Sequence, residues 1–254
     1  MNKTTSTIGK LFLIPTLLGN TTPESVLPEG TLKIVREIRF FIVENIRTTR
    51  RTLSKIGMGN LIDSIEFIEL NKHKNANMMD YLGVAFEGNN IGLMSEAGTP
   101  CVADPGSVVV EMAHQAGIQV VPLSGPNALI MALMGSGFNG QVFAFHGYLP
   151  INERERINAI KNLEKRSMIY NETEIFIETP FRNNALLETL SQHCSAATRL
   201  CIASNITMPD EQILSLPIAD WKGMKIDLNK KPAVFLIYNS GENRYFEKGK
   251  KKGR

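Results

Sequence analysis

Apolar residues along the chain form short runs that alternate with helical stripes, and this alternation predicts the fold class. The runs hold four or five residues, are rich in β-branched and aromatic side chains, and are typical of buried strands. Between the runs, apolar residues recur at intervals of three and four, which is typical of helices that bury one face. The first half therefore predicts an α/β fold with a mainly parallel sheet. Its predicted strands are residues 11–14, 40–43, 65–69, 91–95, 119–123 and 142–145, and its predicted helices include residues 31–38, 48–56 and 78–86.

The pattern changes around Pro150, where we expect a domain boundary. Residues 152–166 follow as a charged helix with apolar residues on one side, which is typical of an exposed crossover. We therefore predict two α/β domains, an N-terminal domain over residues 1–148 and a C-terminal domain over residues 149–254. Further strands are predicted at residues 174–178, 200–203 and 233–238, with a helix at residues 181–193.

Residues 90–126 hold two strand-to-helix turns in succession, each marked by glycine and proline. In the first, Asp104 and Pro105 predict a helix start, because a carboxylate caps free N–H groups and proline is tolerated at the first helical position. Gly117 predicts the end of that helix in a left-handed cap. Asn127 follows the second turn and is placed to cap a helix that is apolar on every side, for which we predict burial.

Either turn by itself is explained by the ordinary punctuation of a sheet protein. We take the two strands that precede the turns as neighbours. Loops at the carboxyl ends of neighbouring parallel strands form the crevice where open α/β sheets bind ligands. Two such turns one crossover apart therefore favour a ligand crevice.

Composition bounds the class of protein. A chain of 254 residues with 43% hydrophobic and 21% charged residues is typical of a globular protein with one large domain or two compact ones. The three cysteines lack paired spacing, so we expect neither disulfides nor a zinc site, and a reducing cytoplasm fits best. The apolar run at residues 11–18 is interrupted by Pro15 and does not resemble a signal peptide. No stretch approaches the ~20 apolar residues of a membrane span.

Several familiar chemistries lack their motifs. No glycine-rich dinucleotide or nucleotide-triphosphate loop is present, and no G-x-S-x-G motif offers a serine nucleophile. What remains is a crevice of backbone groups and small side chains, which suits a cofactor that carries its own reactivity. S-adenosylmethionine is such a cofactor, because its sulfonium already activates the methyl group. The histidines lack metal-ligand spacing and are expected to be structural or solvated: His73, His114, His146 and His193.

A series of sequence blocks carries a family resemblance. The blocks read S-E-A-G-T-P, D-P-G and P-L-S-G-P between residues 95 and 126, with G-Y-L-P at residues 147–150 and E-T-P at residues 178–180. The chain resembles the tetrapyrrole methylase superfamily, the class III S-adenosylmethionine-dependent methyltransferases. Within it, the chain is most similar to the ribosomal RNA small-subunit methyltransferase I family of 2′-O-ribose methylases. The resemblance spans residues 9–238.

The resemblance implies a fold, a cofactor and a reaction. The fold is two α/β domains with a cofactor cleft between them, usually in a homodimer. The reaction is methyl transfer from S-adenosylmethionine to ribosomal RNA of the small subunit, at a cytidine ribose. Carried over motif by motif, the cofactor-binding residues are Leu18, Ser95, Glu96, Ala97, Gly98, Thr99, Val102, Asn127, Ala128 and Glu178.

The acceptor side departs from the family pattern. Where relatives read E-D-T-R, this chain keeps Glu44 and Arg47 but has Asn45 in place of the aspartate. We assign Glu44 as a proton acceptor or orienting group and Arg47 as a phosphate contact, because a ribose hydroxyl must be positioned and lose its proton. An ordinary salt bridge between the two explains them equally well.

Basic residues are clustered, although the net charge is only +3. A solvated helix face and a chain end are the ordinary explanations. If the acceptor is RNA, Arg50, Arg51 and the basic tail are expected to contact phosphates. The clusters are Arg47, Arg50, Arg51 and Lys55, and then Lys248, Lys250, Lys251, Lys252 and Arg254.

Two other functions stay open. The shared fold permits a methyltransferase that acts on a tetrapyrrole or another small molecule. The altered segment 44–47 permits a cofactor-binding RNA module with little activity.

Overall fold

The computed structural model describes residues 8–70 and 77–241. It divides the chain into two compact units, one that ends at Asn127 and one that begins at Ala128. The change of sequence pattern placed the boundary later, between residues 148 and 149. The strand β6 (Phe143–Tyr148) explains the difference, because it pairs with β7 (Thr173–Ile177) in the sheet of the second unit.

The first unit is built on a five-stranded sheet in the order β3-β2-β4-β1-β5. All of its pairings are parallel, as predicted. The expectation that the strands before the two turns are neighbours is wrong, because β1 lies between β4 and β5. β1 suits this central position because its residues are apolar on both faces. The strands are β1 (Leu11–Ile14), β2 (Phe40–Val43), β3 (Glu66–Glu69), β4 (Ile91–Met94) and β5 (Val120–Pro122).

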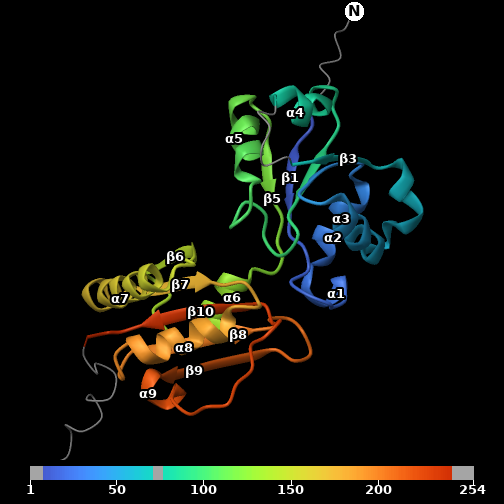
Figure 1. Cartoon of the computed structure of the whole chain (residues 1–254). Helices are drawn as coiled ribbons and strands as arrows, with labels where there is room; N and C mark the ends of the chain where they lie inside the picture. The colour runs from blue at the N-terminus through green and yellow to red at the C-terminus, as the bar shows by residue number, and fades with distance from the viewer. Residues whose placement is uncertain (1–7, 71–76, 242–254) are drawn as a thin grey trace, which may run out of the picture. The chain divides into compact units, whose positions relative to one another are not determined.

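Helices cover both faces of this sheet (Figure 1). On one face, α2 (Glu29–Glu37) and α3 (Ile46–Leu53) bury apolar side chains against β1 and β2. On the other, α4 (Met78–Phe86) and α5 (Ser107–Gln115) pack against β1, β2 and β4. Parallel strands need this cover because they are apolar on both sides.

Some local expectations in the first unit need correction. α5 begins at Ser107, whereas Asp104 and Pro105 predicted an earlier start. Asp104 Oδ1 instead accepts a hydrogen bond of 2.7 Å from the Gly106 N–H and closes the turn before the helix. Gly117 has a φ of 69° and ends the helix as predicted. The short helices α1 (Pro23–Val26), η1 (Ser54–Met58) and η2 (Gly59–Ser64) were not separated by the pattern.

The second unit has a different sheet, in the order β6-β7-β10-β8-β9. Only β6 and β7 run parallel, so the mainly parallel arrangement holds for the first unit alone. The edge strand β9 was missed, because its half-buried residues form no apolar run. The remaining elements are α6 (Ala128–Ser136), α7 (Glu153–Tyr170), α8 (Asn183–His193), β8 (Arg199–Ser204), β9 (Gln212–Pro217), α9 (Ile218–Trp221) and β10 (Ala233–Tyr238).

The two faces of the second sheet carry different helices. α7 and α8 pack on one face around Phe176 and Phe235, and α6 packs against β8, β9 and β10. The prediction that α6 is buried is wrong, because Met134 is 78% exposed and Ile130 is 42% exposed. In α6, apolar residues on every side therefore do not indicate that the helix is buried.

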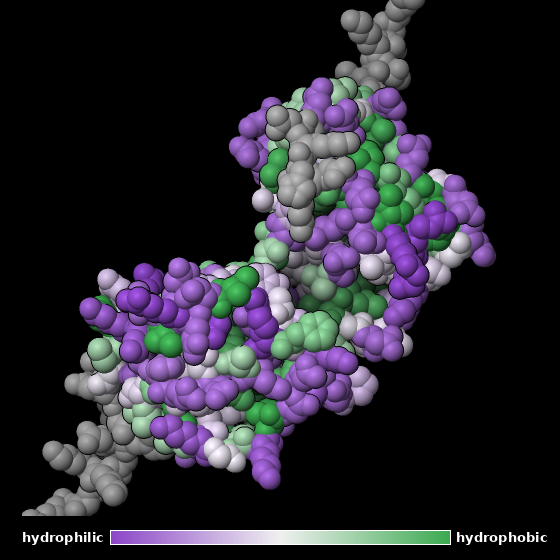
Figure 2. Space-filling view, viewed as in Figure 1, coloured by the Kyte–Doolittle hydropathy of each residue, from purple (hydrophilic) through white to green (hydrophobic). Residues whose placement is uncertain are grey.

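Hydrophilic residues dominate the face of the molecule shown in Figure 2, with apolar residues scattered among them. Within the part of the chain that the structure describes, no helix combines the length and apolarity needed to cross a membrane.

Candidate functional site

The connections after neighbouring strands of the first sheet lead to opposite faces of that sheet. The connections after β1 and β2 lead to α2 and α3 on one face, whereas the connection after β4 leads to α5 on the other. β4 pairs with both β1 and β2. Diverging connections of adjacent strands open a crevice at the carboxyl edge of an α/β sheet, which is where such sheets bind ligands. The crevice stays a prediction, and the strand order moves it to β4, which is flanked by β1 and β2 and not by β5.

Three loops meet at this edge, and we call them the crevice loops: residues 15–20 after β1, residues 95–106 after β4 and residues 123–127 after β5. The Thr16 N–H donates to the Gly98 carbonyl at 2.8 Å and joins the first two. Thr99 Oγ1 donates to the Pro126 carbonyl at 3.3 Å, and Asn127 Nδ2 donates to Thr99 Oγ1 at 3.1 Å. The loops are therefore tied to one another by hydrogen bonds between residues far apart in sequence.

Gly98 lies at the centre of the crevice loops. Its φ is 72°, in the left-handed region that glycine adopts most readily. A Cβ atom at this position would lie 2.9 Å from Leu18 Cδ2 and 3.7 Å from the Pro126 carbonyl oxygen. A side chain at residue 98 would therefore be strained by the backbone conformation and would require the Leu18 side chain to shift.

The structure brings together most of the residues predicted to bind the cofactor. Ser95 is buried, and its hydroxyl points toward the carbonyls of Ala97 and Gly98 at 3.4 and 3.5 Å. Glu96 and Ala97 are exposed, and Val102 is 41% exposed. Leu18, Thr99 and Asn127 belong to the same set of loops, as described above.

The loop after β4 also has features that the sequence did not reveal. Cys101 and Ala103 have φ values of 68° and 62°, which are uncommon for residues other than glycine. Asp104 Oδ2 is buried and has no hydrogen-bond partner among the described residues. Burial, together with the nearby Asp104 carboxylate, raises the pKa of the Cys101 thiol to about 11. The thiol is therefore neutral near pH 7 and is not poised as a nucleophile.

The loop after β2 and the first turn of α3 carry the acceptor residues predicted from sequence. Asn45 Oδ1 accepts a hydrogen bond of 3.1 Å from the Thr48 N–H, so the residue that replaces the family's aspartate caps α3. Thr48 Oγ1 donates to Glu96 Oε1 at 3.4 Å, a long contact that places this loop beside the crevice loops. Glu44 is half-buried and Arg47 is exposed.

The basic residues of α3 have different environments. Arg50 Nη2 lies 2.7 Å from Asp63 Oδ1, and its guanidinium lies 6.0 Å from the centre of the Phe67 ring. Lys55 Nζ donates to Asn20 Oδ1 at 3.1 Å. Arg51 is exposed, and its side chain, like that of Arg47, has no hydrogen bond or ion pair with any described residue. The basic tail at residues 248–254 and His73 lie outside the described residues.

Glu178 lies in the second unit, where the structure gives it a local partner set. Its carboxylate is buried, and Oε1 accepts hydrogen bonds from the Thr179 N–H at 2.6 Å and from Arg182 Nε and Nη2 at 3.0 and 2.5 Å. These bonds fix the turn between β7 and α8. Ala128 begins α6 and is half-buried.

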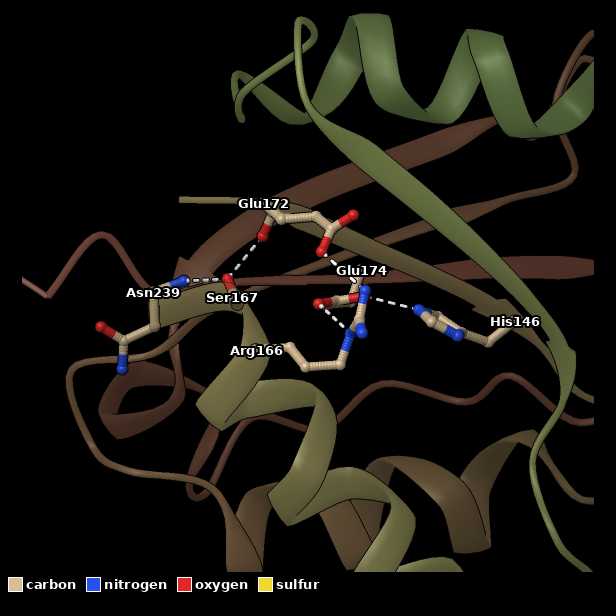
Figure 3. A network of polar contacts seen from close by, with 6 residues as sticks. All are labelled: His146, Arg166, Ser167, Glu172, Glu174 and Asn239. Carbon is tan, nitrogen blue, oxygen red and sulfur yellow. Dashed lines mark hydrogen bonds and ion pairs between the residues drawn. The ribbon is translucent and has the colours of Figure 1, made fainter. Parts of the chain in front are cut away.

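A polar network that the sequence did not reveal lies between β6, β7 and α7 (Figure 3). His146 Nε2 lies 2.5 Å from Glu174 Oε2, and Arg166 Nε lies 3.5 Å from Glu174 Oε1. The Glu174 side chain is fully buried. The network continues from Arg166 Nη2 to Glu172 Oε2 at 2.9 Å, from Ser167 Oγ to the Glu172 carbonyl at 2.6 Å, and from the Asn239 N–H to Ser167 Oγ at 2.8 Å.

Comparison with known proteins identifies the family. Residues 33–221 match the model of the Tetrapyrrole (Corrin/Porphyrin) Methylases. The chain is 28% identical to the ribosomal RNA small subunit methyltransferase I of Vibrio cholerae, over 90% of this chain and 76% of that protein. It is 33% identical to the protein of the same name from Thermotoga maritima, over 72% of this chain and 76% of that protein.

Solved structures show the same fold at lower identity. The methyltransferase CobJ superimposes with a TM-score of 0.59 and 17% identity, over 91% of this chain and 95% of CobJ. The cobalt precorrin-4 methyltransferase superimposes with a TM-score of 0.53 and 13% identity, over 92% of this chain and 96% of that chain. The two-domain α/β fold predicted from the sequence is thus confirmed.

Proposed function

The chain belongs to the tetrapyrrole methylase family, and we propose that it transfers the methyl group of S-adenosylmethionine to a ribose 2′-hydroxyl of small-subunit ribosomal RNA, at a cytidine. The observation that carries the donor side is the convergence of three crevice loops on Gly98 beside β4. The relatives named above favour ribosomal RNA as the acceptor. The homodimer implied by the resemblance remains part of the proposal, and sedimentation of the purified protein tests it.

The residues of the crevice loops fit S-adenosylmethionine. They offer backbone groups, small side chains and the buried Asp104 Oδ2, which has no hydrogen-bond partner among the described residues and is an acceptor for a ligand. The cofactor supplies an activated methyl group, so the protein's task is alignment. The residues proposed to hold it are Leu18, Ser95, Glu96, Ala97, Gly98, Thr99, Val102, Asn127 and Ala128.

Glu178 remains a proposed cofactor contact from the second unit, and its hydrogen bonds restrict which of its atoms can bind the cofactor. Oε1 already accepts three hydrogen bonds, two of them from Arg182. A contact with the cofactor would therefore use Oε2 or act through the turn that Glu178 fixes.

The acceptor hydroxyl has to be positioned and has to lose its proton. We propose Glu44 as the proton acceptor or orienting group and Arg47 as a phosphate contact. Glu44 lies in the loop after β2 and Arg47 lies in the first turn of α3, which adjoins the crevice loop after β4 through Thr48 and Glu96. This position supports the proposal, because the residues proposed for the acceptor adjoin residues proposed for the donor within one unit.

The decisive experiment offers isotopically methyl-labelled S-adenosylmethionine together with two acceptors in separate reactions. Small ribosomal subunits from a strain that lacks the gene should take up label, and digestion to nucleosides should place it on a 2′-O-methylcytidine. Label that enters only an added porphyrinogen would replace this proposal with a small-molecule methyltransferase. Cofactor binding by calorimetry without transfer to either would indicate an RNA-binding module with little activity.

A further inference from the structure

The exposed side of α3 presents two arginines, whereas the other basic residues of this segment are engaged. The buried side consists of Ile46, Thr49 and Leu53, which face the core. Arg47 and Arg51 are four residues apart and therefore lie one above the other on the opposite side, with side chains about 6 Å apart at their bases. Both side chains are exposed, and neither guanidinium has a hydrogen bond or ion pair with another described residue.

The flanks of this arginine pair are fixed by their contacts. On one flank, Thr48 donates to Glu96 of the crevice loop after β4, and Lys55 donates to Asn20 of the crevice loop after β1. On the other flank, Arg50 turns toward Asp63 and Phe67, away from the crevice loops. The pair therefore lies on α3 between the crevice loops and the outer edge of the first unit.

Two exposed guanidinium groups one helical turn apart are suited to bind a polyanion that has negative charges at regular intervals. Guanidinium groups bind phosphate oxygens in a planar, two-pronged arrangement, and they hold their charge at every physiological pH. A compact substrate with scattered carboxylates needs no such row. The geometry favours a single nucleic-acid strand whose successive phosphates cross the pair.

We propose that Arg47 and Arg51 bind two phosphates of the acceptor RNA strand next to the methylated nucleotide, and that α3 thereby sets the position of that nucleotide along the crevice. The inference rests on the proposed RNA methyltransferase function and turns the phosphate contacts predicted for Arg47 and Arg51 into a path for the RNA strand. Arg51 is then a positioning residue for the acceptor. Arg50 is not part of the path, although the sequence grouped it with Arg51.

The test compares Arg47→Ala and Arg51→Ala with Arg50→Ala, which removes the same charge from the same helix. Affinity for a fluorescent single-stranded RNA that carries the methylated segment is measured at several salt concentrations. Arg47→Ala and Arg51→Ala should each weaken binding roughly tenfold, because a charge-assisted contact is lost. Each should also reduce the slope of log affinity against log salt by about 0.7, the value for one phosphate contact on a single strand. Arg50→Ala should leave the slope of the wild-type protein unchanged.

Cofactor binding by calorimetry and the circular dichroism spectrum control for folding, and both should be unchanged in all three variants. Arg51→Lys keeps the charge and should recover most of the slope but less of the affinity, since lysine binds phosphate as a point charge. Equal losses for Arg50→Ala and Arg51→Ala, or an unchanged slope for Arg51→Ala, would overturn the inference. Failure of the proposed function is distinct, because the wild-type protein would then transfer no methyl group to RNA.

Discussion

The crevice loops of the first unit and the polar network of the second unit are both built from residues distant in sequence, but they depend on different physics. The crevice loops are joined by backbone carbonyls and N–H groups around a glycine, with Thr16, Thr99 and Asn127 as neutral bridges. The polar network is joined by charges around a fully buried carboxylate, Glu174. The first is therefore sensitive to added atoms and the second to lost charge.

This difference matters because it separates ligand binding from stability. A crevice of small residues leaves room for a cofactor, and its hydrogen bonds keep the loops in place without filling the space. A buried carboxylate that contacts histidine and arginine leaves no such room. Removal of one partner lowers the free energy of unfolding, because a buried charge then lacks compensation. Substitutions in the two regions should consequently affect different measurements.

The largest effect is expected from Gly98→Val. The branched side chain would collide with Leu18 and would occupy a left-handed conformation that valine avoids. We expect the affinity for S-adenosylmethionine, measured by calorimetry, to fall by more than about 100-fold, equivalent to about 3 kcal/mol or more.

Gly117→Val is the matched control for this change. Gly117 has a φ of 69° but no atom near the position of its Cβ. It should show a similar backbone strain in its free energy of unfolding and bind the cofactor normally. Cofactor binding retained in Gly98→Val would refute the assignment of the crevice.

The next effect concerns the polar network. His146→Ala removes the closest partner of the buried Glu174 carboxylate and leaves Arg166 Nε at 3.5 Å. We expect the free energy of unfolding, from urea titration, to fall by about 3 kcal/mol. His114→Ala, on an exposed part of α5, should change it by less than about 0.5 kcal/mol.

A double variant makes this prediction sharper. His146→Ala with Glu174→Gln should be more stable than His146→Ala alone, because the charge that lacks compensation is removed together with its partner. A double variant that is less stable than either single variant would show that the network stabilises through packing and not through charge.

Glu178→Gln tests whether Glu178 stabilises the turn before α8, binds the cofactor, or does both. The substitution keeps the shape but removes the charge that accepts three hydrogen bonds at the turn before α8. We expect a loss of about 2 kcal/mol in the free energy of unfolding, since hydrogen bonds to charged groups contribute more than neutral ones. Glu188→Gln, on the exposed side of α8, is the control. If the folded Glu178→Gln variant also binds the cofactor tenfold more weakly, Glu178 serves the cofactor as well as the turn.

The sequence predicted the crevice better than the network, for a physical reason. Ser95, Gly98 and Asn127 stand in short loops directly after apolar strands, so local patterns and family blocks locate them. His146, Glu174 and Arg166 lie on three separate elements, and Glu174 stands inside a strand that is almost entirely buried. Strand order was equally hidden, because nothing local to residues 91–126 shows that β1 inserts between β4 and β5.

The last and smallest effect concerns Cys101, a residue of the crevice loops whose surroundings raise the pKa of its thiol. Burial and then Asp104 raise its pKa from 9.0 to about 11, so the folded protein holds the proton after the unfolded chain has released it. The contribution of Cys101 to stability is therefore complete below pH 9 and is lost as the pH rises through 11. At pH 8, alkylation of Cys101 by iodoacetamide should be about 100-fold slower than that of a free cysteine, because the thiolate is the reactive form. Peptide mass spectrometry measures the rate at several pH values, with Cys101→Ser as the control for alkylation elsewhere. If Cys101 reacts at pH 8 as fast as free cysteine, the loop after β4 is open to water, and the contrast between an ordered crevice and a charged network loses its basis.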